Sequence, residues 1–255
     1  MSSSEAYSII LALLTAFASG LVGSFALMKR MTLAGDVISH IALPGLGLAI
    51  LFHINPLIGG AATLFVGILL IWNLEGSTNL TVETAIGVIF TASVAIGALI
   101  TPSEDLIEAL FGGFTGLDTL SFLTGLGAVF VIVLFIFKFK NRLILGLFSP
   151  ELAASTGLNL KRLNLYYLLI FGLTILLGLK FLGAILVGAL IIIPAAIGRQ
   201  LTHTLSAFLF TSALAGVVAV AFGFFISSYY NLELGPTVVV AASALFLLSL
   251  IKKKA

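Results

Sequence analysis

Long apolar runs recur along the whole sequence, and they restrict the possible folds more than any other feature. A helix that crosses a membrane needs about 20 consecutive, mostly apolar residues. Hydrophobic residues fill 60% of the 255 positions and charged residues only 9%, whereas about a quarter of a soluble domain is charged. We therefore predict an all-α, polytopic transmembrane bundle that forms a single domain over residues 1–255. The length allows about eight to ten spans. Hydropathy favours nine, over 6–28, 33–52, 56–74, 83–101, 119–137, 163–181, 183–200, 205–226 and 236–251.

The basic residues predict how these spans are oriented. If the N-terminus lies outside, two Lys and Arg residues follow the first span on the inside, five follow the fifth, one follows the seventh and three end the chain. Only Lys180 of the 12 basic residues is then outside, as the positive-inside rule requires. We expect an external N-terminus, a cytoplasmic C-terminus and no cleaved signal peptide. Gly183, Gly188 and Pro194 leave open whether 180–205 crosses fully or is broken.

An ionisable pair lies inside the second predicted span. Asp36 and His40 are four residues apart and therefore share one face of a helix. Pro44 lacks the N–H that would bond to the carbonyl of His40, so we expect a kink there and a free carbonyl beside the pair. Ionisable residues inside spans are costly and usually functional, which favours a divalent cation site. A polar pair that holds two helices together is the alternative. Pro194 marks a second predicted kink.

The segment 138–162 is too polar to cross the membrane and too apolar to be a simple linker. Ser149, Pro150 and Glu151 form a helix-start signal. Gly157 is expected to end that helix in a left-handed conformation. A short helix flanked by basic residues needs a surface to dock on, either lipid headgroups or a cytoplasmic protein.

Other polar residues lie near the ends of spans. His53 and Glu233 are secondary candidates for contact with a cation, although an interfacial role without a ligand is the favoured interpretation for His53 and for His203. The sequence has no cysteine, which excludes disulfides and thiolate metal sites. It also lacks a P-loop motif, so we expect no ATP binding of that kind by this chain.

Four stretches, in order along the chain, resemble the membrane permease of the metal-uptake ABC importers of the manganese/zinc/iron type. The four stretches are GDVISHIALPGLGLA at 35–49, TAIGVIF at 84–90 with EALFGG at 108–113, SPELAASTGLN at 149–159, and FLGAILVGALIIIPAAIGRQL at 181–201. A fifth stretch, ELGPTVVV at 233–240, matches more weakly, because it places a glycine before the proline where the family pattern has Pro-Thr-Gly.

The resemblance implies a permease like those of type II ABC importers, in a prokaryotic plasma or inner membrane. A second permease copy, two cytoplasmic ATP-binding subunits and an extracellular or periplasmic metal-binding protein would be its partners, and nucleic acid would not. Asp36 and His40 would line the path of Mn²⁺, Zn²⁺ or Fe²⁺, a transported substrate rather than a cofactor. A segment at about 143–162 would couple the chain to the separate ATPase through Glu151, Leu152, Ala154 and Gly157.

Two alternatives from other classes remain open at this stage. One is a secondary metal transporter driven by protons or sodium, in which Asp36 would titrate during transport. The other is an intramembrane enzyme that uses Asp36 and His40 as acid and base. The lack of any nucleophile or further catalytic carboxylate within the spans disfavours the enzyme.

Overall fold

The structure is a computed structural model that describes residues 3–31, 33–78, 81–100, 118–182 and 184–252. All regular secondary structure in these ranges is helical, so the all-α prediction is confirmed. The outer stretch 108–113 and lysines 253 and 254 lie outside the described residues. The helices are α1 (Ser3–Met28), α2 (Ala34–Ser39), the 3₁₀ helix η1 (His40–Ala42), α3 (Leu43–Leu51), α4 (Pro56–Ser77), α5 (Val82–Ile100), α7 (Thr119–Phe148), α8 (Pro150–Ser155), α9 (Leu160–Leu182), α10 (Ala184–Leu201), α11 (Leu205–Tyr230) and α12 (Leu234–Lys252).

In the described ranges, eight helical segments are long and apolar enough to cross a membrane. The second is the composite of α2, η1 and α3, which together cover the predicted span 33–52. The predicted span that is not among these eight, 183–200, corresponds to α10, an 18-residue helix that continues through Pro194. At 1.5 Å per residue it is about 27 Å long, slightly less than the hydrocarbon thickness of about 30 Å. The segment is thus a continuous helix rather than a re-entrant loop.

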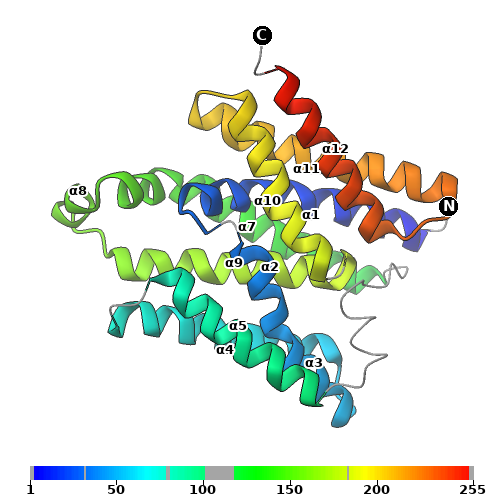
Figure 1. Cartoon of the computed structure of the whole chain (residues 1–255), viewed down its shortest axis with the longest axis horizontal. Helices are drawn as coiled ribbons and strands as arrows, with labels where there is room; N and C mark the ends of the chain where they lie inside the picture. Colours follow the sequence, from blue (N-terminus) through cyan, green and yellow to red (C-terminus); the bar gives the residue numbers. More distant parts are fainter. Residues whose placement is uncertain (1–2, 32, 79–80, 101–117, 183, 253–255) are drawn as a thin grey trace.

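The helices form two groups on either side of a central row (Figure 1). Helices α10, α11 and α12 pack against one another, and α1 packs against both α10 and α11. On the other side, α3, α4 and α5 contact one another, and α9 joins α4 to α1. Helix α2 packs chiefly on α10 and also contacts α9 and α5, whereas α3 packs chiefly on α4 and also contacts α5. The broken second span therefore passes from one group to the other.

Glycines allow the backbones to approach closely within each group. A Cβ atom on Gly23 of α1 would lie 1.9 Å from the carbonyl oxygen of Ile191 on α10. A Cβ on Gly45 of α3 would lie 2.0 Å from the carbonyl oxygen of Gly59 on α4. Lipid provides little hydrophobic force between helices, so association depends on this kind of close packing of small residues. These glycines bring α1 close to α10 and α3 close to α4.

Candidate functional site

The break in the second span is built by residues 40–44. Its helical hydrogen bonding changes to a 3₁₀ turn over His40–Ala42, and Pro44 is the second residue of α3. The Leu43 N–H donates to the His40 carbonyl, closing this turn. The sequence-based expectation of a free His40 carbonyl is therefore wrong, because a tighter i to i+3 bond replaces the one that proline cannot make. The helical hydrogen-bonding pattern thus changes at His40 and Pro44, next to the ionisable pair.

Asp36 and His40 lie on one face at this break, as their spacing predicts. The Nε2 atom of His40 is 4.0 Å from Oδ1 of Asp36, too far for a direct hydrogen bond. Two ligand atoms that each bind one ion at about 2.1 Å lie at most about 4.2 Å apart, so the pair lies within reach of a single ion. The His40 side chain is 19% exposed and that of Asp36 is 53% exposed. The pair thus combines a sheltered imidazole with an accessible carboxylate.

Neighbouring helices hold this pair in place. The His40 ring lies against Phe90 of α5, with 5.8 Å between ring centroids. Gly188 of α10 faces Asp36, since a Cβ there would lie 2.8 Å from the Asp36 Cβ. The Ser39 hydroxyl donates to the Asp36 carbonyl at 2.6 Å. Both helix groups therefore contribute to the surroundings of the pair.

The secondary candidates do not join Asp36 and His40. His53 lies exposed in the turn after α3, with a left-handed φ of 54°. Glu233 and His203 are also exposed, at the starts of α12 and α11. Among the described residues, no three or more His, Asp or Glu side chains gather in a group that would hold a metal ion. One copy of the chain thus brings two donor side chains together.

The helix predicted after Ser149 is present as α8. Its end is a Schellman motif: the Gly157 N–H donates to the Ala154 carbonyl, the Leu158 N–H donates to that of Ala153, and Gly157 has a φ of 76°. The left-handed glycine is therefore confirmed. Ala153 is fully buried against its own chain, so the apolar side of α8 is already partly covered. The other residues of α8 are exposed, among them Glu151, Leu152 and Ala154.

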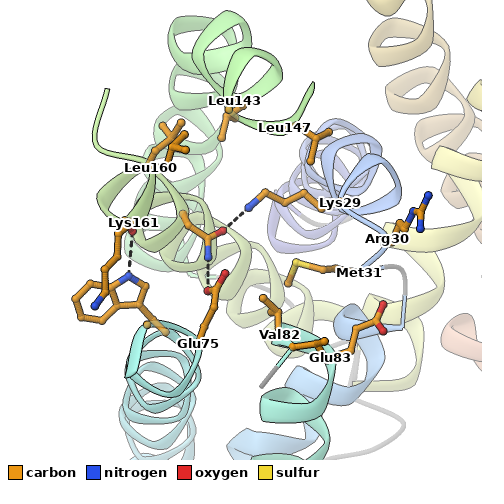
Figure 2. A pocket seen from close by; sticks show the side chains of 16 residues that line it. Lys29, Arg30, Met31, Glu75, Val82, Glu83, Leu143, Leu147, Leu160 and Lys161 are labelled. Carbon is orange, nitrogen blue, oxygen red and sulfur yellow. Dashed lines mark hydrogen bonds between the residues drawn. The ribbon is translucent and has the colours of Figure 1, made fainter. Parts of the chain in front are cut away.

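A half-buried polar network that the sequence reasoning missed joins three helices (Figure 2). The Lys29 ammonium donates to the side-chain oxygen of Asn164, and the amide of Asn164 donates to the carboxylate of Glu75. Burial lowers the pKa of Lys29 to about 8, and the Glu75 charge opposes this shift. These residues line a cavity of about 660 Å³. The network ties the end of α1 to α4 and to the start of α9.

The model of the ABC 3 transport family matches residues 5–253 of this sequence. The chain belongs to this family. The zinc uptake membrane protein ZnuB of Haemophilus influenzae is 32% identical over 253 residues, covering 96% of this chain and 95% of the relative. The manganese transport membrane protein MntC of Halalkalibacterium halodurans is 31% identical, over 93% of this chain and 83% of the relative.

A solved structure of PsaBC from Streptococcus pneumoniae in complex with Fab has the same fold, with a TM-score of 0.84 at 26% identity. The match covers 98% of this chain and 91% of that one. Family membership and the polytopic helical fold, both expected from the sequence, are confirmed by these matches. The chain is a multi-pass membrane protein.

Proposed function

We propose that this chain is the permease of an ATP-driven importer and that Asp36 and His40 line the path of a divalent transition metal ion. The observation that carries the proposal is an accessible carboxylate within 4.0 Å of an imidazole at a helix break inside a span. Relatives named for zinc and for manganese uptake support it. Fe²⁺ rests on the family resemblance alone, and the donor set does not choose among the three metals.

A second copy of the chain completes the site. The pair supplies one oxygen and one nitrogen, whereas these metals take at least four ligands. In a two-fold symmetric dimer, Asp36 and His40 of each copy face those of the other across the axis. The 53% exposure of the Asp36 side chain in the isolated chain is what such an interface requires. The ion then moves between two helix breaks, one from each copy.

Coupling to ATP hydrolysis follows from the position of α8. Its exposed residues Glu151, Leu152 and Ala154, with the Gly157 turn, form the contact with a separate cytoplasmic ATPase. Displacement of α8 moves the start of α9, and Asn164 transmits that movement to Lys29 just ahead of α2. The N-terminus is external and the C-terminus cytoplasmic, and an external metal-binding protein delivers the ion at the opposite end from α8.

The coupling contact is tested with Ala154→Arg, which adds a long charged side chain at an exposed position. We expect the permease to assemble in the membrane, but co-purification of the ATPase and metal uptake to fall at least about tenfold. Arg199→Glu at the end of α10 is the control, because it alters charge without touching α8. Normal uptake by Ala154→Arg would remove α8 from the contact.

The metal path is tested by uptake of Mn²⁺ and Zn²⁺ into proteoliposomes that hold the permease and its ATPase. Asp36→Asn keeps the side-chain shape and removes the charge, and His40→Ala removes the nitrogen donor. Either change acts twice in a dimer, so we expect uptake to fall about 100-fold or more while assembly persists. His203→Ala is the matched control. Uptake driven by an ion gradient without ATP would instead indicate a secondary transporter.

A further inference from the structure

A groove of about 600 Å³ lies between the last turns of α7, the turn after α8 and the start of α9. A second hollow of about 370 Å³ adjoins it on the side of α4, and Asn159, Arg162 and Tyr166 line both. Neither hollow contains Asp36 or His40. The end of α7 and the start of α9, which line the groove, lie at the end of the molecule that carries α8 (Figure 1).

The charge of this groove is entirely basic. Arg142 lines the larger hollow, Lys161 lines the smaller one, and Arg162 lines both. All three side chains are exposed, and no acidic residue lines either hollow. In the described part of the chain, no carboxylate lies within 4.0 Å of these three cations. Lys161 also lines the neighbouring cavity around Lys29 together with Glu75, whose charge it feels, whereas Arg142 and Arg162 line only the groove and its adjoining hollow.

Aromatic rings accompany two of the three cations. The Arg142 guanidinium lies 5.5 Å from the centre of the Phe139 ring, and the Lys161 ammonium lies 5.2 Å from that of Trp72. The Trp72 indole N–H donates to the Lys161 carbonyl at 3.0 Å, which fixes the ring. Aromatic rings beside basic residues at the end of a span are typical of the level of the lipid headgroups. Phe137, five residues before Arg142 on α7, is exposed and continues the apolar surface of α7 toward the bilayer.

We propose that this groove binds the headgroup of an anionic phospholipid, with Arg142 and Arg162 holding the phosphate. Basic pockets between helices at the cytoplasmic side of a membrane suit such headgroups, and Trp72 and Tyr166 provide an amphipathic edge at that depth. The exposed apolar face of α7 accommodates the acyl chains. The bound lipid bridges α7 and α9 at the base of α8, so it steadies the coupling helix. The proposal does not depend on which metal is carried.

The single tryptophan of the chain, Trp72, reports on this site directly. The full-length chain is reconstituted in phosphatidylcholine bilayers that contain rising fractions of brominated phosphatidylglycerol, whose bromine atoms quench tryptophan at contact. We expect brominated phosphatidylglycerol to quench Trp72 with a relative binding constant at least about fivefold above that of brominated phosphatidylcholine, since one basic side chain near the surface contributes about that factor. Equal quenching of the unsubstituted chain by the two lipids would overturn the proposal.

Substitutions then test whether Arg142 and Arg162 are the residues that bind the headgroup. In the double variant Arg142→Gln/Arg162→Gln, the ratio of the binding constants for phosphatidylglycerol and phosphatidylcholine should fall to about one. Arg142→Lys keeps the charge and should keep this preference. Arg199→Gln removes an exposed charge outside the groove and should leave the preference unchanged. A preference that survives the double substitution would overturn the assignment. So would displacement by millimolar inorganic phosphate, which would identify a site for free phosphate. If the double variant keeps the lipid preference but loses the ATPase, the groove is a protein contact.

Discussion

Two apolar helices of this protein carry an internal proline, and only one of them breaks. At Pro44 the chain passes from α2 through a 3₁₀ turn into α3, whereas α10 continues through Pro194. The surroundings differ: α2 packs chiefly on α10 and α3 chiefly on α4, so the two halves are anchored in different groups, although both also contact α5. Pro194 is buried within one group, where its ring faces Gly216 of α11. The comparison indicates that packing of the two halves, more than proline, decides whether a helix breaks.

The largest expected effect comes from removing the packing that holds α3. In Gly45→Leu the new side chain meets the Gly59 backbone at 2.0 Å, so α3 must leave α4. We expect destabilisation at the upper end of the roughly 1–3 kcal/mol typical of overpacking, with uptake lost. The melting temperature in detergent measures the effect. Gly127→Leu in α7 is the control, because nothing lies within 4 Å of its Cβ position. A Gly45→Leu protein with normal stability and uptake would show that this contact does not hold the break.

A smaller effect is expected from the prolines themselves. Pro44→Ala restores an N–H that can bond to the His40 carbonyl in an α-helical pattern, which straightens the segment beside the metal pair. We expect uptake to fall severalfold. Pro194→Ala restores an N–H in a helix that is already continuous, so uptake should stay within about twofold and stability should hold or rise. Paired uptake assays decide the point, and a greater loss in Pro194→Ala would reverse the comparison.

Sequence and structure agree where the determining interactions are local. Hydropathy predicts the spans, the i to i+4 spacing places Asp36 and His40 on one face, and Gly157 ends α8 as its sequence indicates. Each of these depends on residues within a few turns of one another. The free carbonyl predicted at His40 fails because a neighbouring N–H takes the bond that proline vacates.

The features that sequence reasoning missed join distant parts of the chain. Lys29 and Asn164 are 135 positions apart, and Asn164 and Glu75 are 89 apart. No local pattern links them, although a lone acidic residue near the end of an apolar run, such as Glu75, signals a buried partner. The burial of Ala153 is likewise set by contacts of α8 with its own chain, which periodicity over six residues does not reveal.

Direct metal binding tests the central claim, that the broken helix rather than any other span carries the ion. The purified permease dimer is dialysed against Zn²⁺ or Mn²⁺, and the amount of metal bound per chain is measured by elemental mass spectrometry. The two-fold site predicts about one ion for two chains, lost in Asp36→Asn and in His40→Ala and retained in His203→Ala. An unchanged stoichiometry and affinity in Asp36→Asn would contradict the account, because the ion would then be held elsewhere.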